Sequence, residues 1–166
     1  MAEIEMGQRR WQNARELLER ASQSQRAALA AMPGDPAIKR ALCALLLDQT
    51  KVCQAQQQPD EAVRLVREAL SLPRLGASDF YNAACALASS VPITHGEKKQ
   101  DVAALAVVTL ERAIAAGWNN AAKTSRDPNL APLRDREDFR RLLSKLFDRG
   151  FPADPFARPL KLSVSH

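Results

Sequence analysis

The side chains best suited to chemistry in this chain are few and lie far apart in the sequence. It contains two histidines, His95 and His166, and three cysteines, Cys43, Cys53 and Cys85, with no Cys-x-x-Cys pair. Structural metal sites need several ligands, usually at short and regular spacing. Each cysteine instead falls on an apolar helical stripe or beside alanines, where a thiol packs as a small hydrophobic group. We therefore expect buried thiols rather than a metal or redox site, and no cofactor.

Groups for acid–base or nucleophilic catalysis are equally scattered. The Ser89–Ser90 pair has only His95 near it in the sequence, within a polar segment. Carboxylates such as Asp35, Asp60 and Asp135 stand where helices should begin, which is a capping position rather than a catalytic one. General acid–base catalysis requires titratable groups that converge in one pocket. The sequence therefore predicts a protein that is not an enzyme.

The composition favours a fold made only of helices. The chain of 166 residues is 46% hydrophobic but only 5% aromatic, and it is rich in alanine, which suits closely packed helices better than strands. The net charge of +5 is a mild excess, not the concentrated basic run typical of nucleic-acid binding. No apolar run reaches the roughly 18 residues that a membrane span needs, and the N-terminus lacks the apolar centre of a signal peptide. We expect a soluble, cytoplasmic protein without membrane contact.

Apolar periodicity divides the chain into helices around one central hairpin. Residues 49–73, QTKVCQAQQQPDEAVRLVREALSLP, contain two apolar-striped arms separated by a polar break at 56–60. Asp60 is expected to cap the second arm and Pro73 to end it. The expected helices run over about 3–32, 36–57, 60–72, 80–89, 101–116, 119–125 and 136–149.

Capping and helix-breaking residues set the expected ends of these helices. The caps or terminators are Asp35, Pro36, Ser78 or Asp79, Gly117 and Asp135. Polar residues near Ser22 and Ser24 leave open a break in the first helix. The segment 90–99 contains proline, glycine and two lysines and is expected to be a mobile loop. Residues 151–166 are expected to form a poorly ordered tail.

Three helix ends resemble one another and indicate an internal repeat. Ala28, Ala69 and Ala113 occupy the same place in similar short sequences and lie 41 and 44 residues apart. A helix–turn–helix that recurs every 20 to 50 residues is typical of a solenoid, in which each unit buries its apolar face against the next.

The small and large residues of these units resemble those of tetratricopeptide repeats. The matching positions are Thr50, Cys53, Ala62, Val66 and Ala69, then Ala84, Leu87, Ala106, Leu110 and Ala113. The resemblance implies an α–α superhelix over residues 1–150, with a partial first repeat at 3–33, repeats at 36–72 and 78–117, and a C-terminal capping segment at 119–149. It also implies a scaffold that binds a protein or peptide in its concave groove.

A finer resemblance concerns three short sequences. They are FYNAAC at 80–85, DPNLAPLR at 127–134 and DF at 138–139. Their order is similar to that in the C-terminal tetratricopeptide region of planctomycete-type bacterial serine/threonine protein kinases. The chain contains no glycine-rich phosphate loop, no His-Arg-Asp triplet and no Asp-Phe-Gly. The resemblance therefore implies a non-catalytic regulatory region of a signalling kinase.

The family resemblance also points to candidate binding residues. Peptide-carboxylate binders of the family hold a chain terminus with lysine and asparagine donors in the groove. Asn82 matches such an asparagine, Lys51 lies one spacing earlier, and Lys123 and Arg126 supply cations from the next unit.

The chain departs from that binding pattern one helical turn before Lys51. Leu47 stands where a lysine is expected, and Asp48 adds an opposing charge. The alternative is that Asn82 bonds a neighbouring helix and the lysines are simply solvated.

Two further kinds of partner stay open. The helix that contains Trp11 lacks the first arm of its own repeat and could pair with a second copy of the chain. The C-terminal helix carries several arginines that could meet RNA, but acidic residues balance them and no aromatic side chains interleave to stack on bases, so nucleic acid is disfavoured.

Overall fold

The computed structural model describes residues 2–150, with side chains described from residue 10 to residue 149. Within this part of the chain every secondary-structure element is a helix, so the prediction of an all-α fold is confirmed. The α-helices are α1 (Ala2–Ala31), α2 (Pro36–Ala55), α3 (Pro59–Ser71), α4 (Ala77–Ser90), α5 (Lys98–Ala115), α6 (Ala121–Arg126) and α7 (Glu137–Gly150), and the 3-10 helices are η1 (Val91–Ile93) and η2 (Pro128–Leu133).

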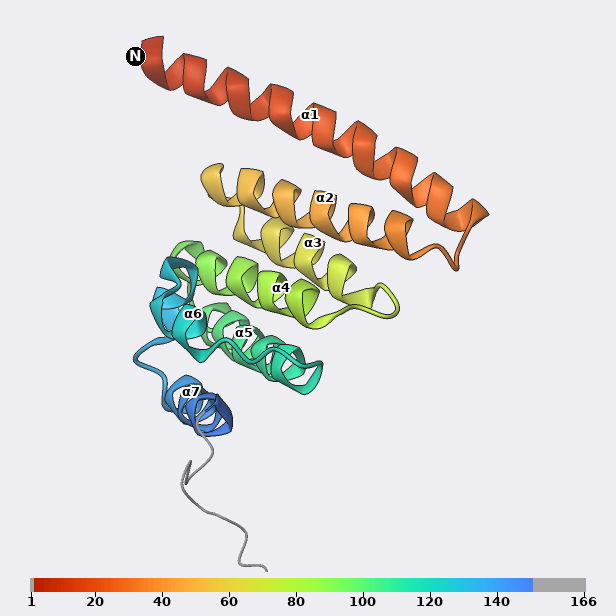
Figure 1. Ribbon diagram of the computed structural model, residues 1–166. Coiled ribbons are helices and arrows are strands. Elements are labelled where there is room, and N and C mark those ends of the chain that lie inside the picture. The colour runs from red at the N-terminus through yellow and green to blue at the C-terminus, as the bar shows by residue number, and fades with distance from the viewer. Residues whose placement is uncertain (1, 151–166) are drawn as a thin grey trace, which may run out of the picture.

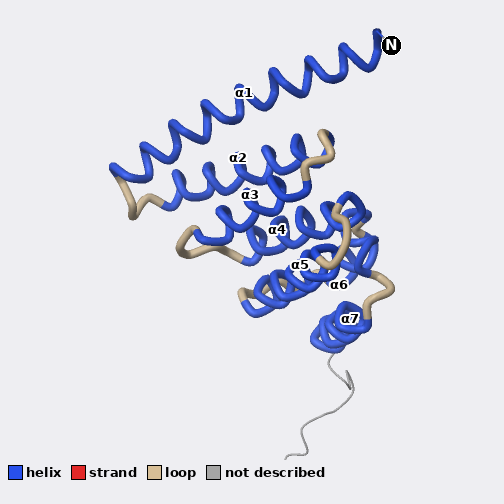
Figure 2. Tube along the Cα trace, turned by 180° about the vertical axis from the view of Figure 1, so that it is seen from behind, coloured by secondary structure: helices blue, strands red, loops and turns tan. Residues whose placement is uncertain are grey.

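The helices follow one another through space in nearly the order of the chain. Figure 1 shows α1 at one end of the molecule and α7 at the other, and Figure 2 shows the same order from behind. The most extensive contacts join α1 to α2, α2 to α3 and α4 to α5. The connections between successive helices are short, as at residues 32–35 and 56–58. A short connection makes two successive helices pack as antiparallel neighbours.

Alanines form much of the contact surface between these helices. Ala62 and Ala69 of α3, Ala84 of α4, and Ala106 and Ala113 of α5 have no exposed surface. A side chain this small at a crossing point lets two helix backbones approach closely. The small and large positions on which the sequence comparison rested are therefore core positions, whatever family they belong to.

The beginning of α2 and the course of α1 follow the sequence predictions. Asp35 Oδ1 accepts the backbone N–H groups of Ala37 at 2.7 Å and Ile38 at 3.3 Å, and Pro36 is the first helical residue. α1 is unbroken: the hydroxyls of Ser22 and Ser24 donate to backbone carbonyls of the preceding turn, and these bonds do not interrupt the helix.

The predicted end of the fifth helix at Gly117 is also confirmed. Gly117 has φ +106°, Trp118 N–H donates to Ala113 O at 2.9 Å, and Gly117 N–H donates to Ile114 O at 3.1 Å. These two bonds close the helix with a left-handed residue, a conformation that glycine adopts without steric cost.

The predicted cap at Asp60 is wrong. α3 begins at Pro59, and no side chain caps it. Because proline occupies the first helical position, Asp60 falls inside the first turn and its carboxylate points outward. There it meets Lys98 Nζ of α5 at 3.0 Å, an exposed ion pair between two neighbouring helices.

Two other predicted caps also need correction. α4 begins at Ala77, so neither Ser78 nor Asp79 precedes it; Asp79 lies in the first turn and its Oδ2 accepts the Gly76 N–H at 2.8 Å. At α7, Asp138 rather than Asp135 bonds the first turn, because Asp138 Oδ1 accepts the Phe139 N–H at 2.8 Å.

The first half of the segment predicted as a mobile loop, residues 90–94, is folded onto the core, whereas residues 95–99 are exposed. α4 continues directly into η1, and Val91 and Thr94 are buried. Thr94 Oγ1 donates to Ser90 O at 2.7 Å, and α5 begins at Lys98. The predicted tail, residues 151–166, lies outside the described residues.

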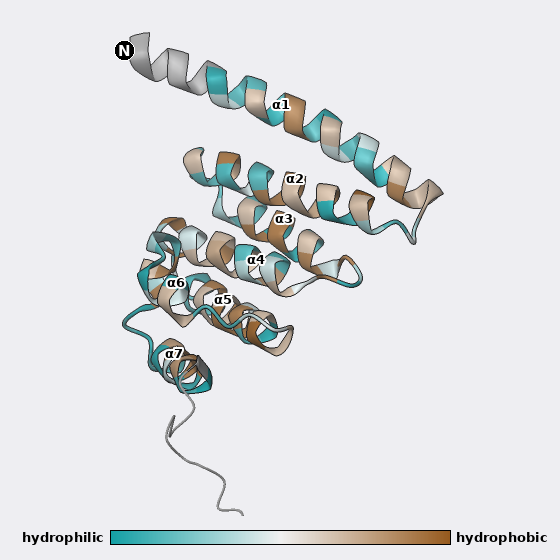
Figure 3. Cartoon of the chain, viewed as in Figure 1, coloured by the Kyte–Doolittle hydropathy of each residue, from teal (hydrophilic) through white to brown (hydrophobic). Residues whose placement is uncertain are grey.

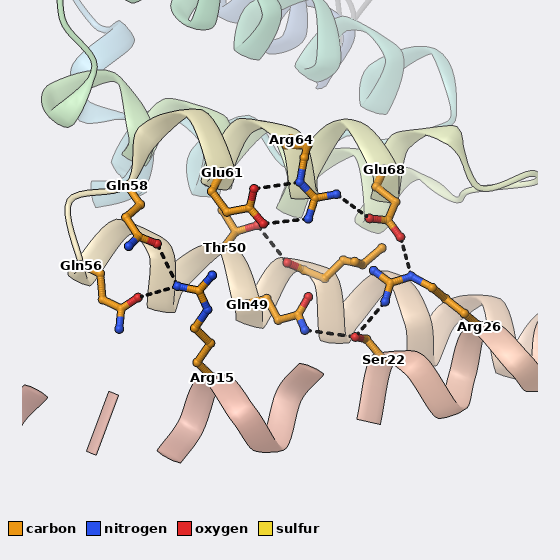
Figure 4. Close-up of polar contacts among 11 residues, drawn as sticks. Arg15, Ser22, Arg26, Gln49, Thr50, Gln56, Gln58, Glu61, Arg64 and Glu68 are labelled. Atoms are coloured by element: carbon orange, nitrogen blue, oxygen red, sulfur yellow. Dashed lines mark hydrogen bonds and ion pairs between the residues drawn. The ribbon is translucent and has the colours of Figure 1, made fainter. Parts of the chain in front are cut away.

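Several polar contacts join α1 to α2 and α3. Figure 4 shows Arg26 Nε paired with Glu68 Oε1 at 2.7 Å and Gln49 Nε2 donating to Ser22 Oγ at 3.0 Å. Of the side chains described in α1, only Ser22 is buried. In Figure 3, α1 is correspondingly more hydrophilic than the other long helices.

Across residues 2–150, no helix combines the length and the apolar composition needed to cross a membrane.

Candidate functional site

A cleft of about 390 Å³ opens between α2, α4 and the segment that runs from α6 to η2. α2 contributes one wall, α4 the floor, and the α6–η2 segment the opposite wall. Among the side chains that line it are Leu47, Asp48, Lys51, Tyr81, Asn82, Cys85, Ala86, Ser89, Lys123, Asp127 and Asn129.

Three of the four binding residues predicted from the sequence line this one cleft. Lys51 comes from α2, Asn82 from α4 and Lys123 from α6. Arg126 does not line it and instead borders an adjoining shallow hollow with Asn120 and Pro128, which Lys123 and Asp127 also line. Lys123 and Arg126 are three residues apart on α6, and of the two only Lys123 reaches the cleft.

Asp127 ties one wall of the cleft, the α6–η2 segment, to the floor formed by α4. Its Oδ2 accepts the Tyr81 hydroxyl at 2.8 Å and the Cys85 thiol at 3.7 Å. Its Oδ1 accepts both the backbone N–H and the side-chain amide of Asn129, each at 2.9 Å. An ionised carboxylate has about four lone-pair sites. All of them are used within the protein, so Asp127 positions the site and has little capacity left to bind a ligand.

The titratable groups around Asp127 are held in unreactive forms. Burial, followed by the charge of Asp127, raises the pKa of the Cys85 thiol to about 12. Burial and the hydrogen bond to Asp127 also raise the pKa of Tyr81 far above its ordinary value. Burial alone would raise the pKa of Asp127, but hydrogen bonds from Tyr81 and Asn129 outweigh it and lower this pKa. At neutral pH Cys85 is a thiol and not a nucleophile.

Lys123 is placed by an aromatic pair. The rings of Tyr81 and Trp118 stack with centroids 3.9 Å apart, and Trp118 Nε1 donates to Thr124 Oγ1 at 3.0 Å. The Lys123 ammonium lies 5.2 Å from the centroid of Tyr81 and 5.4 Å from that of Trp118. Such contacts with ring faces attract a cation. Within the described chain no carboxylate lies close enough to Lys123 to form an ion pair, so its charge is available to a ligand.

Lys51 and Asn82 differ in whether their hydrogen-bonding groups already have partners within the protein. Lys51 Nζ is paired with Asp48 at 2.7 Å, an exposed contact within one turn of α2. The side chain of Asn82 is exposed and forms no hydrogen bond with any described residue, which removes the alternative that it bonds a neighbouring helix. Asn82 can therefore donate and accept toward a ligand.

Comparisons of the chain with protein-family models, with curated proteins and with solved structures found no match. The resemblance to tetratricopeptide repeats and to kinase-associated regions therefore stays a prediction from the sequence.

Three cleft residues have a role that reasoning from the sequence missed. Asp127 and Asn129 belong to one of the short sequences noted for their resemblance, and Ser89 was considered only as a nucleophile. Ser89 Oγ in fact donates to Asn129 Oδ1 at 3.2 Å. No sequence pattern reveals that these partners meet, because Asp127 bonds a tyrosine 46 residues away.

The cysteines are buried, as the sequence predicts. Cys43, Cys53 and Cys85 are all unbridged and lie among core residues. In the part of the chain described by the structure, no three side chains of His, Cys, Asp or Glu type gather as metal ligands would.

Proposed function

We propose that this chain is a non-catalytic protein-interaction module, a tetratricopeptide-like superhelix that binds an extended peptide segment in the cleft between α2, α4 and α6. The observation that carries the proposal is the convergence of Lys51, Asn82 and Lys123 on one cleft, with Lys123 unpaired in the described structure. Nucleophilic or acid–base chemistry has no comparable support, because the titratable groups nearby are protonated or saturated.

The chemistry of the lining residues suits an extended peptide. Asn82 offers both a donor and an acceptor, which is what a backbone amide needs. Leu47 and Ala86 supply apolar wall between the polar groups, as small binding sites commonly do. Lys123 and the two unused donors of Lys51 favour a segment rich in acceptors, such as one with an acidic side chain or a terminal carboxylate.

The proposed partner class is a signalling protein. It rests on the similarity to the C-terminal regions of bacterial serine/threonine kinases, with FYNAAC and DPNLAPLR as the residues that carry it. In this reading the chain recruits a substrate or regulator for a catalytic domain that it does not itself contain.

The experiment begins with selection of binders from a random peptide library displayed in both internal and C-terminal positions. The selected peptide is then titrated against the purified wild type and three variants. Lys123→Glu and Asn82→Ala should each weaken binding by about tenfold or more, since hydrogen bonds to charged groups contribute roughly 1.5–3 kcal/mol.

Arg126→Glu is the matched control, because it makes the same charge reversal one turn away on the same helix but outside the cleft. Its affinity for the peptide should fall by less than about threefold, an effect of long-range charge alone. Equal losses for Lys123→Glu and Arg126→Glu would show that the cleft is not the binding site.

A further inference from the structure

The cleft continues into the adjoining hollow, and Lys123 and Asp127 stand where the two meet. Both residues line the cleft between α2, α4 and α6, and both also line the hollow that Arg126 borders. A segment whose acidic group meets Lys123 therefore has room to continue on either side of that contact. This arrangement favours an internal acidic side chain over a chain terminus as the group that Lys123 binds.

The charges that line this continuous surface nearly cancel. The cations are Lys51, Lys123 and Arg126, and the anions are Asp48 and Asp127. Three positive and two negative charges leave a single positive charge, which one carboxylate neutralises. Because the cleft encloses only about 390 Å³, an anion inside it lies within about 10 Å, one Debye length at 0.1 M salt, of the charges that line it.

The negative charge of Asp127 is held in place and no cation neutralises it. Among the described residues its carboxylate accepts hydrogen bonds from Tyr81, Cys85 and Asn129, which are all neutral donors. Arg134 reaches the backbone oxygen of Asp127, at 3.4 Å, and does not line the cleft. Burial opposes ionisation of Asp127, but the hydrogen bonds from Tyr81 and Asn129 outweigh it and lower the pKa. An anion in the cleft therefore meets a fixed negative charge.

Asp48 places a second negative charge on the wall formed by α2. It pairs with Lys51 at 2.7 Å, so within the described chain Lys123 is the cleft cation that has no carboxylate partner. A ligand with one carboxylate can bind Lys123 without disturbing the pair on α2. A ligand group with two negative charges needs a second cation, and inside the cleft Lys51 can supply it only by leaving Asp48.

We propose that the cleft takes an internal peptide segment with one aspartate or glutamate at the Lys123 contact, and that it excludes the same segment when phosphoserine stands at that position. The proposal rests on the proposed function, because it concerns the ligand of the same cleft. A phosphoserine carries a charge of about −1.5 to −2 at pH 7. It therefore exceeds the positive charge of the lining and is repelled by Asp48 and Asp127. Repulsion of this kind is a common source of specificity between related ligands.

The test uses the peptide selected from the library, synthesised with glutamate, glutamine or phosphoserine at its acidic position and with an amidated C-terminus. Isothermal titration calorimetry at pH 7.5 and 0.1 M salt measures the three dissociation constants for the wild type. The glutamate peptide should bind at least about tenfold more tightly than either of the others. Glutamine lacks the charge that Lys123 binds, and phosphoserine carries too much of it.

Asp48→Asn tests the source of the exclusion. It removes one negative charge and frees Lys51, so the lining then carries two surplus positive charges. The phosphoserine peptide should bind this variant at least about tenfold more tightly than it binds the wild type. Asp60→Asn is the matched control, because Asp60 is likewise paired with a lysine, Lys98, at 3.0 Å but does not line the cleft. It should leave the ratio of the phosphoserine and glutamate dissociation constants within about threefold of the wild-type ratio.

The possible failures distinguish this proposal from the proposed function. Selection of no peptide, or equal losses for Lys123→Glu and Arg126→Glu, would remove both. If binding depends on the cleft, four results would overturn only the present proposal: a selected peptide without an acidic side chain, a requirement for a free C-terminus, phosphoserine bound as tightly as glutamate, or an Asp48→Asn variant that still excludes phosphoserine.

Discussion

Asp127 shows how one side chain can organise a site without binding anything itself. It receives hydrogen bonds from α4 through Tyr81 and Cys85 and from the start of η2 through Asn129. Because these donors come from both sides, the carboxylate fixes the distance between the floor of the cleft and the wall that carries Lys123. The specific contacts of a ligand would then fall to Asn82 and the lysines.

Replacing Asp127 by asparagine should lower the free energy of unfolding by about 1–3 kcal/mol, because an amide nitrogen would face donors that now meet a carboxylate oxygen. Urea denaturation at pH 7 measures this loss. Asp48→Asn is the matched control, since Asp48 takes part only in an exposed ion pair with Lys51, and we expect its loss to stay below about 1 kcal/mol. Equal losses would mean that Asp127 is no more than another surface carboxylate.

The ends of α2 and α5 are closed in the same way by different residues. At both ends, two backbone N–H groups that follow the helix donate to carbonyl oxygens of its last turn. One residue at each of these ends has a positive φ. That residue is Gly117 after α5, with φ +106°, but Gln57 after α2, with φ +57°. A positive φ is sterically unfavourable for a residue with a side chain, and glycine avoids this cost. At Gln57 the unfavourable conformation turns the chain from α2 into α3.

Gln57→Gly should therefore raise the free energy of unfolding, by about 0.5–1 kcal/mol, even though it removes a side chain. Gly117→Ala should lower it by a similar or larger amount, since nothing else compensates for the left-handed backbone there. Thermal unfolding of both variants beside the wild type gives the two signs. Stabilisation by neither, or destabilisation by both, would contradict the account of these helix ends.

At the scale of the whole molecule, the core depends on thiols that stay protonated. Burial, with a smaller contribution from Asp79, raises the pKa of Cys43 to about 11, and that of Cys85 lies at about 12. In the unfolded chain a thiol loses its proton near pH 9. The folded state therefore binds more protons than the unfolded state above that pH.

The sign of this linkage predicts alkaline destabilisation. The stabilising effect of the two protonated thiols is complete below about pH 9 and is lost as the pH rises toward 11 and 12. The free energy of unfolding, measured in urea at pH 7, 9 and 10.5, should thus fall slightly by pH 9 and mostly in the last interval. In the double variant Cys43→Ala, Cys85→Ala the fall should be smaller, although its stability at pH 7 is lower. An equally steep fall in the variant would assign the effect to other groups.

The sequence by itself determined that the chain is helical and where several helices begin and end. Apolar spacing, the Asp35–Pro36 start and the Gly117 stop act within one or two turns, so backbone sterics and local hydrogen bonds decide them. The predicted cap at Asp60 failed because a neighbouring proline shifted the helix start by one residue. The tertiary structure alone decided that Lys123 faces the cleft while Arg126 does not, and that Tyr81 meets Asp127. These outcomes depend on how whole helices pack, and residues 46 positions apart in the chain carry no local signal of their meeting.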